Sequence, residues 1–415
     1  MRVRRLGGDR AGEIRLTRFL RNAAVTPELM VVEAALRTGA RCAGLHVLAI
    51  QDTTVVRSEG GGGLYLHPTL AVDAASGAIL GLTHAEFLSR THGKKADRRK
   101  KPIAEKQSRR WLDAADRSAE VCATAARLTM IGDRENDIFQ AFALRPARAD
   151  LLVRAAHDRA LEDGGKLFAR IDALPVAGRA ELDLSAKPGR KARQAQVAVR
   201  FATARISRPR NGLREDLPAS LAVTVVDVRE ESPPPGESPV HWRLLTTHAV
   251  TDAAGAFAVA DLYRRRWGIE QLFRTLKTQG FDIEGLLIED EPPVRNLVMA
   301  TLIAAVSIQQ LVHARDGQTS PGQTSPGPLR PLTDAFEAED QPLLEAFCTK
   351  LQGKTLRQKN PHPAGSLAYG AWVCARLGGW TGYYGKPGPI VMLEGWLYFH
   401  AAKHGATLAI GLNDV

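Results

Sequence analysis

Two aspartates in the chain each lie at the end of a short apolar run. Asp52 follows the apolar part of HVLAIQDTT (residues 46–54), and Asp133 follows that of LTMIGDRE (residues 128–135). Both runs are typical of buried strands. A carboxylate where a strand leaves the core is well placed to line a cleft. An aspartate that caps the next turn produces the same pattern, so both roles stay open.

A third carboxylate lies in a charged segment, FAVADLYRRRWGIEQLFRTLKT, which predicts one long helix over residues 254–279. Counted from Tyr263, the residues Arg266, Glu270 and Lys277 follow three, seven and fourteen positions later. At about 100° per residue these side chains fall within an arc of roughly 60° on one continuous helix. A solvated face with charge pairs would explain the charges, but not their alignment with a tyrosine.

Together these carboxylates, Asp52, Asp133 and Glu270, indicate a metal site. Three carboxylates from separate parts of a chain form the hard oxygen site that suits Mg²⁺ or Mn²⁺. Two such ions can activate a water or a 3′-hydroxyl on one side of a phosphodiester and stabilise the leaving oxygen on the other. Nearby Arg and Lys side chains would neutralise phosphate oxygens.

The elements that must position these residues follow a mixed pattern. Residues 12–40 read as helical, with a helix start at Thr26–Pro27, and residues 75–77 as the turn of a hairpin. A helix is expected over residues 105–128, followed by the strand of Asp133, a short helix, and a strand at residues 149–158. This order predicts an α/β sheet with helices on its faces.

The sequence pattern changes in the second half of the chain. Residues 159–240 hold several short β-like runs and predict an inserted antiparallel sheet, and residues 241–248 read as another strand. An apolar helix is expected over residues 297–314. The tandem repeat GQTSPGQTSP in residues 317–326 cannot build a core and reads as a linker. Residues 331–415 read as mostly helical.

Composition limits the function classes. The 415 residues carry a formal charge of +11, with a pI near 9.7, which favours nucleic acid as a partner first and an anionic membrane surface second. The four cysteines are far apart and suggest neither a zinc site nor a disulfide framework, which fits a reducing cytoplasm. No uninterrupted apolar stretch reaches about 18 residues, so we expect a soluble protein that is not exported.

The spacing Y-x2-R-x3-E-x6-K, together with AIQDTT and GDRENDI, resembles the signature of DDE transposases of the insertion sequence 4 family. That family includes the transposase of transposon five. The resemblance extends from about Arg18 to Lys277, and GYYGKPGP near the C-terminus is also similar to some members.

The resemblance implies a ribonuclease H-like catalytic core interrupted by an inserted antiparallel β subdomain, with a mostly helical C-terminal region. It implies a catalytic, metal-binding triad of Asp52, Asp133 and Glu270, with two Mg²⁺ or Mn²⁺ ions per site. It also implies contacts with DNA, by the following residues: Tyr263, Arg266, Lys277, Trp242, Arg154 and Arg134. Trp242 would stack on a base flipped from the transposon end, although a tryptophan of a core strand gives the same pattern.

The domain organisation expected on this basis has six parts. They are a partial helical DNA-binding region at 1–45, the first part of the core at 46–158, the β subdomain at 159–240, the second part of the core at 241–315, a linker at 316–330, and a C-terminal helical region at 331–415. Relatives act as dimers, so the last region is the expected interface of a homodimer. The basic run at residues 94–110 reads either as a mobile loop touching DNA phosphates or as a solvated loop.

The leading functional hypothesis is a cut-and-paste transposase that cleaves DNA at transposon ends and joins the freed 3′-hydroxyl to target DNA. Only 51 residues precede Asp52, fewer than in most family members, so the first half of the end-binding region is expected to be missing. Two alternatives stay open. One is an inhibitor that binds DNA or full-length subunits without transposing, and the other is a metal-dependent nuclease without strand transfer.

Overall fold

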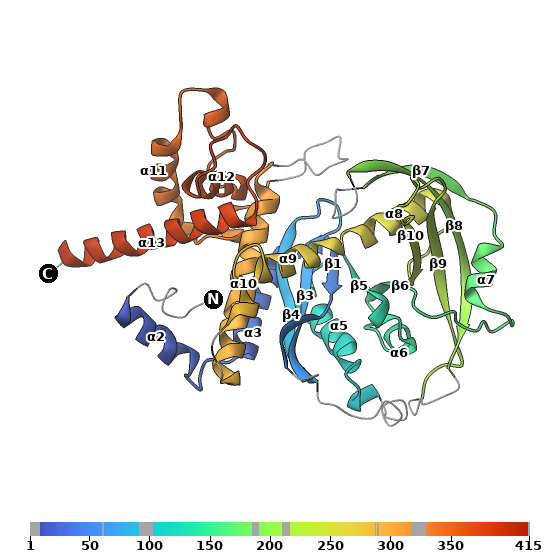
Figure 1. Cartoon of the computed structure of the whole chain (residues 1–415). Coiled ribbons are helices and arrows are strands. Elements are labelled where there is room, and N and C mark those ends of the chain that lie inside the picture. The colour runs from blue at the N-terminus through green and yellow to red at the C-terminus, as the bar shows by residue number, and fades with distance from the viewer. Residues whose placement is uncertain are drawn as a thin grey trace. The chain divides into compact units, whose positions relative to one another are not determined.

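The computed structural model describes residues 9–59, 62–90, 103–184, 191–209, 216–286, 288, 290–317 and 329–413. The chain divides into two compact units (Figure 1). Unit 1 consists of residues 1–41, 71–82 and 268–415, and unit 2 of residues 42–70 and 83–267.

One sheet holds the strands of the described residues, and most of it belongs to unit 2. Its strand order is β2-β3-β1-β5-β6-β10-β9-β8-β7, with β4 paired to β3. The strands are β1 (His46–Gln51), β2 (Thr54–Glu59), β3 (Gly62–Asp73), β4 (Ile79–Arg90), β5 (Arg127–Gly132), β6 (Ala149–Arg154), β7 (Gly178–Leu184), β8 (Arg193–Ser207), β9 (Ser220–Glu230) and β10 (His241–Thr246).

The centre of the sheet is parallel. Strand β1 pairs with β5 and β5 pairs with β6, all three in the same direction. Their sequences are nearly continuous apolar runs that are buried almost throughout, as expected for parallel strands covered on both faces. The predicted strands before Asp52 and Asp133 are therefore confirmed, and the strand predicted at residues 149–158 is present but ends at Arg154. The hairpin is confirmed as well, since its turn falls between β3 and β4, with Gly77 at φ 75°.

The block at residues 159–240 contains antiparallel strands, but they do not form a sheet of their own. Strand β10 pairs antiparallel with β6 on one side and with β9 on the other, and β8 and β7 continue outward from β9. Strand β9 is buried along most of its length, as an interior strand must be. The change in sequence pattern near residue 159 thus coincides with a change from parallel to antiparallel strands within one sheet.

The helices of unit 2 pack on this sheet. They are α5 (Arg109–Val121), α6 (Phe139–Ala143), α7 (Leu167–Asp172) and α8 (Ala253–Arg264), with short 3-10 turns at Ile103–Glu105 and Arg134–Asn136. Helix α5 contacts β1, and α8 contacts β6, β8 and β9. Helix α5 is shorter than the predicted helix at 105–128, since it begins at Arg109 and ends at Val121, and the residues from Arg127 on belong to β5.

The single long helix predicted over residues 254–279 is wrong. The chain forms α8 and then α9 (Trp267–Lys277), with a turn at Arg265 and Arg266 between them. The amides of these two arginines bond to the carbonyls of Leu262 and Tyr263, three residues back and not four, at 3.2 and 3.0 Å. This tightening changes the angular phase of the helix. Gly268, a weak helix former, follows directly.

The break has a consequence for the predicted face of four aligned side chains. Tyr263 lies on α8, Arg266 lies in the turn, and Glu270 and Lys277 lie on α9. The alignment of these four side chains on one face requires an unbroken helix, so that prediction is wrong. The boundary between the two units also falls here, at Trp267 and Gly268.

Unit 1 is mostly helical. Its helices are α2 (Arg10–Leu20), α3 (Pro27–Arg41), α9 from Gly268 on, α10 (Glu291–Ala314), α11 (Gln341–Leu351), α12 (Leu367–Leu377) and α13 (Pro389–Asn413), with 3-10 turns at Ile283–Gly285, Leu332–Asp334, Ala338–Asp340 and Leu356–Gln358. The helix start predicted at Pro27 and the helical character of residues 331–415 are confirmed.

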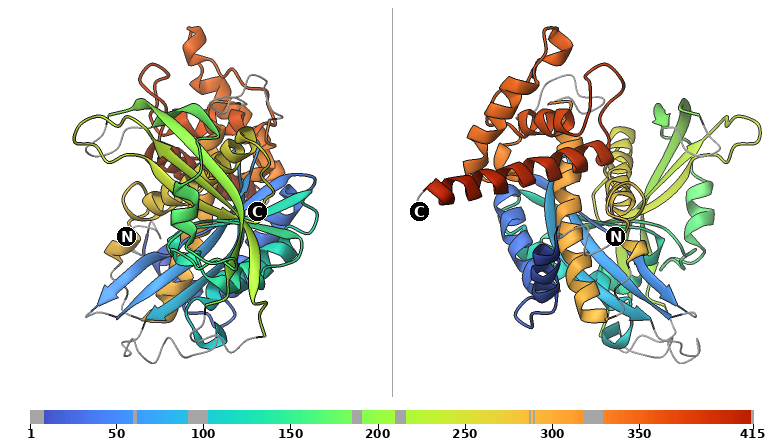
Figure 2. Two further views of the ribbon diagram at one scale, coloured as in Figure 1. Left: turned by 90° about the vertical axis from the view of Figure 1, so that its right-hand side faces the viewer. Right: turned by 60° about the vertical axis from the view of Figure 1, so that its left-hand side comes forward.

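Helix α10 is the centre of unit 1. It contacts α2, α3, α12 and α13, and Figures 1 and 2 show it running beside α3. By length and composition α10 could cross a membrane, but 67% of its most apolar window is buried inside the protein, as in the core helix of a globular domain. Its C-terminal half joins a core with α12 and α13 that includes Leu311, Trp372 and Phe399.

Candidate active site

Asp52 and Asp133 lie at the same edge of the sheet. Each is the first residue after its strand, and the two strands, β1 and β5, are parallel neighbours with Ile50 opposite Ile131. The carboxyl ends of parallel strands are where open α/β sheets bind ligands. The observed register therefore brings the ends of these two strands, and with them Asp52 and Asp133, to one edge of the sheet.

Both carboxylates make local contacts. Asp52 Oδ1 accepts a hydrogen bond from the Thr53 amide at 2.8 Å, and Asp52 Oδ2 lies 3.1 Å from Arg266 Nη1. Asp133 Oδ1 accepts from the Glu135 amide at 2.8 Å and so caps the 3-10 turn that follows. A carboxylate has about four acceptor positions, so a capping contact leaves capacity for a second ligand.

Glu270 and Lys277 belong to unit 1. Glu270 lies in the first turn of α9 and is half-buried, and the neighbouring Ile269 and Leu272 are buried. Lys277 lies at the end of the same helix, where its Nζ is 2.7 Å from Glu284 Oε1. Across the described residues, no three His, Cys, Asp or Glu side chains are arranged to hold a metal ion.

A basic and aromatic cluster in unit 2 unites the other predicted DNA-contacting residues. The rings of Trp242 and Tyr263 lie with centroids 6.3 Å apart, and the Arg266 guanidinium carbon lies 5.8 Å from the Tyr263 ring centroid. Arg154 on β6 donates to the His241 carbonyl at 2.9 Å. Burial lowers the pKa of Arg154, and the positive charge of Arg134 lowers it further.

The electrostatics of the cluster favour an anion. The pKa of Tyr263 is raised, chiefly by burial, so its phenol stays protonated and can donate a hydrogen bond. The positive charges of Arg134 and Arg266 both act on Arg154 and lower its pKa. A phosphodiester would relieve this repulsion and would meet donors of the planar geometry that phosphate prefers.

A family model described as the transposase DDE domain matches residues 81–307, more than half of the 415 residues. The chain belongs to the DDE transposase family. The matched segment includes Asp133 and Glu270, whereas Asp52 precedes it. Members of the family act on DNA, which fits the basic cluster beside Asp133.

Sequence reasoning missed one residue of this DDE transposase that contacts the segments following both aspartates. Arg110 was counted only as part of the basic run at 94–110, but its side chain is buried, with 6% exposure. It donates to Thr53 Oγ1 and to Glu135 Oε2. Trp111, next to it, is buried as well. The amphipathic pattern of α5 was the available signal. Residues 94–102 of the run lie outside the described residues.

Asp137 was also missed, although it lies within the GDRENDI motif of this transposase. It is buried and accepts hydrogen bonds from the amides of Ala156 and His157, at 2.7 and 3.0 Å. The Arg159 guanidinium pairs with it as well. This buried pair ties the segment after β5 to the segment after β6, close to Arg154. Its partners are far away in sequence, so no local pattern predicts them.

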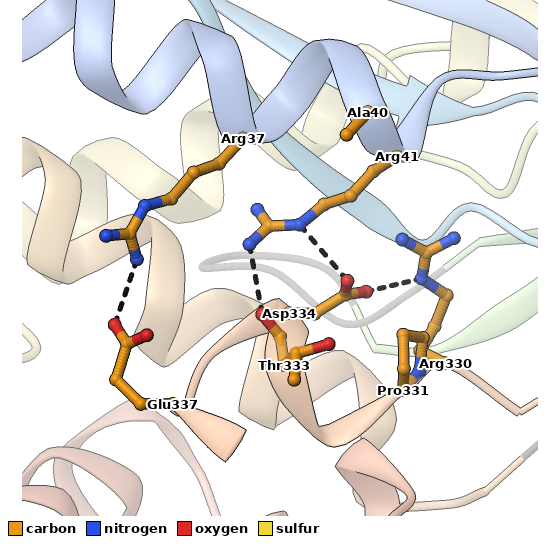
Figure 3. Close-up of a pocket in the computed structure, with 8 residues that line it drawn as sticks. All are labelled: Arg37, Ala40, Arg41, Arg330, Pro331, Thr333, Asp334 and Glu337. Atoms are coloured by element: carbon orange, nitrogen blue, oxygen red, sulfur yellow. Dashed lines mark hydrogen bonds and ion pairs between the residues drawn. The ribbon is translucent and has the colours of Figure 1, made fainter. Parts of the chain in front are cut away.

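A pocket of about 510 Å³ in unit 1 contains none of the predicted site residues (Figure 3). Three arginines line it, and each pairs with a carboxylate: Arg41 with Asp334 at 3.1 Å, Arg330 with Asp334 at 2.5 Å, and Arg37 with Glu337 at 3.1 Å. Asp334 is almost completely buried. The pocket therefore holds an ion-pair network that joins the end of α3 to the segment before α11.

Proposed function

We propose that this DDE transposase carries out cut-and-paste transposition, with Asp52, Asp133 and Glu270 as its catalytic carboxylates. The supporting observation is the position of Asp52 and Asp133 directly after adjacent parallel strands, with the arginine cluster beside them. The strand order β4-β3-β1-β5-β6 supports a ribonuclease H-like core. The three sequence motifs support membership of the insertion sequence 4 family, similar to the transposase of transposon five.

The donor set fits Mg²⁺ or Mn²⁺. Asp52 and Asp133 offer hard oxygen ligands at one sheet edge, and each has one oxygen oriented by a backbone amide. Together with Glu270 they would hold two divalent ions, which would supply Lewis acidity for phosphodiester chemistry. The residues themselves fix the ligand geometry, and the arginines position the scissile phosphate.

We assign DNA binding to the basic and aromatic cluster in unit 2 and to Lys277. Arg134, Arg154 and Arg266 would bind backbone phosphates, and the protonated Tyr263 would donate a hydrogen bond to one of them. Trp242 is half-buried and lies beside Tyr263, so one of its faces is suited to stacking on a flipped base. The partners proposed are transposon-end DNA, target DNA and a second copy of the chain, with residues 331–415 as the dimer interface.

Substitution of the three carboxylates tests this assignment. Asp52→Asn, Asp133→Asn and Glu270→Gln remove one negative charge each with little change of shape, so we expect loss of DNA cleavage with retained DNA binding. Cleavage of a duplex carrying the terminal repeats would be measured by gel, and binding by mobility shift. Glu120→Gln on α5, with its side chain 64% exposed, is a matched control for loss of charge. A carboxylate variant that cleaves at the parent rate is not part of the catalytic site.

A further inference from the structure

The guanidinium of Arg110 lies between the two chain segments that carry Asp52 and Asp133. Arg110 is in the first turn of α5, and its Nη1 donates to the carbonyl of Gln107 at 2.8 Å. Its Nε donates to Thr53 Oγ1 at 3.2 Å, and its Nη2 donates to Glu135 Oε2 at 2.6 Å. One planar group therefore connects the segment after β1 to the segment after β5.

Each contact leads on to an aspartate through one further hydrogen bond. The Thr53 amide donates to Asp52 Oδ1, and the Glu135 amide donates to Asp133 Oδ1, both at 2.8 Å. The position of Thr53 thus sets the orientation of one carboxylate, and the position of Glu135 sets that of the other. Metal ligands must be held to within about 0.5 Å, so a link between the two segments bears directly on the site.

The surroundings of Arg110 hold its side chain in place. Its guanidinium carbon lies 5.0 Å from the Trp111 ring centroid, and the His67 ring meets Trp111 edge-on at 4.6 Å. His67 Nδ1 is 2.9 Å from Thr53 Oγ1. Thr53 Oγ1 therefore contacts both the Arg110 guanidinium and the His67 ring.

We propose that Arg110 is a positioning residue that sets the separation of Asp52 and Asp133 for divalent metal binding. This inference rests on the proposed function. A lysine could keep the charge, but its single ammonium cannot span Thr53 and Glu135 as the planar guanidinium does. Arg110→Lys should therefore disturb the site even where the fold is kept.

The experiment is a Mn²⁺ titration of the full-length chain without DNA, followed by the electron paramagnetic resonance signal of free Mn²⁺. Substitutions of groups that orient metal ligands weaken metal affinity by roughly 10- to 100-fold, so Arg110→Lys is expected to raise the Mn²⁺ Kd by about tenfold or more. Arg117→Lys is the matched control, because Arg117 lies on the same helix with its side chain 64% exposed. Its Kd should equal that of the parent.

A second variant covers the case in which Arg110→Lys does not fold. The Glu135 side chain is 57% exposed, so Glu135→Ala should fold, yet it removes the partner of Arg110 beside Asp133. We expect a raised Kd here too, and a double variant that is less weakened than the product of the two single effects. Normal Mn²⁺ affinity in Glu135→Ala, or in folded Arg110→Lys, would overturn the role of Arg110.

Asp133→Asn separates this outcome from failure of the proposed function. If Asp133→Asn loses Mn²⁺ binding while Arg110→Lys and Glu135→Ala keep it, the metal site stands and the positioning role falls. If Asp133→Asn and Asp52→Asn both bind Mn²⁺ as the parent does, the proposed metal site itself is wrong, and the role of Arg110 falls with it.

Discussion

At the scale of single residues, capping and catalysis are compatible roles for the two aspartates. Asp133 caps a 3-10 turn, which is the alternative that the sequence left open. The cap uses one carboxylate oxygen, which accepts from the Glu135 amide, and this hydrogen bond restricts the orientation of the group. Asp52 is oriented in the same manner by the Thr53 amide. A local hydrogen bond thus aids the proposed chemistry by fixing the direction of a ligand.

Lys277 offers a test of the phosphate contacts at this scale. Its ammonium pairs with Glu284 at 2.7 Å, so a DNA phosphate would replace or share that partner. We expect Lys277→Ala to weaken DNA binding uniformly across sequences and to lower the slope of log affinity against log salt by about 1. Fluorescence anisotropy at several salt concentrations measures this slope. Lys166→Ala, at the exposed position directly before α7, should leave it unchanged. An unaltered slope for Lys277→Ala argues against the contact.

His248 predicts how stability depends on pH. Burial lowers the pKa of His248 to about 4, and Arg127 and Asp150 face the same ring. The unfolded chain binds this proton near pH 6.5, whereas the folded chain resists it, so acid favours unfolding. The neutral His248 ring contributes on the order of 3 kcal/mol to the free energy of unfolding. This contribution is complete above pH 6.5 and is lost as the pH falls towards 4. The midpoint temperature of thermal unfolding should therefore fall less over this pH range in His248→Gln than in the parent. An identical decline would exclude His248 as the titrating group.

At the scale of elements, the closest helix packing in unit 1 depends on small residues. A Cβ added at Gly395 on α13 would collide with the backbone carbonyl of Cys374 on α12, whereas one added at Gly405 meets nothing within 4 Å. Gly395→Ala should therefore destabilise the protein by about 1–3 kcal/mol. Gly405→Ala should stabilise it by up to about 1 kcal/mol through helix propensity. Denaturant unfolding measures the change in the free energy of unfolding of each variant. Equal changes in the two variants would contradict this close packing of α12 against α13.

The elements that could be predicted are those whose signal is local. Strands β1 and β5 appear as apolar runs that end on Asp52 and Asp133, and the start of α3 appears as a proline in a first turn. The break between α8 and α9 could not be predicted, because the three arginines before Trp267 are good helix formers and Gly268 is a weak signal by itself.

The candidate site likewise contains residues that the sequence could predict and residues that it could not. Residue types and spacing pointed to Asp52, Asp133 and Arg266, and the family resemblance pointed to Arg134 and Arg154. The fold of unit 2 brings these residues to one region. The burial of Arg110 between Thr53 and Glu135 depends on contacts 57 and 25 residues away in the chain. Such long-range pairing leaves no local pattern. The sequence therefore placed Arg110 in a basic run instead of beside the carboxylates.

At the scale of the whole molecule, the residues proposed for catalysis and DNA binding are distributed over both units. Unit 2 holds the sheet, Asp52, Asp133 and the basic and aromatic cluster. Unit 1 holds Glu270, Lys277 and the helices around α10. The third carboxylate thus belongs to a different unit from the first two. The formal charge of +11 gives the chain a long-range attraction for DNA, in addition to the local contacts proposed for the cluster.

The joining of DNA ends tests the central claim most directly. A short duplex with a pre-cleaved terminal repeat would be incubated with supercoiled plasmid, Mg²⁺ and the purified chain, and the products resolved on a gel. We predict covalent joining of the duplex 3′-hydroxyl to the plasmid by the parent protein, and none by Asp133→Asn. Plasmid nicking without joined product would instead indicate a plain nuclease. Joined product formed by Asp133→Asn at the parent rate would contradict the assignment of the catalytic carboxylates.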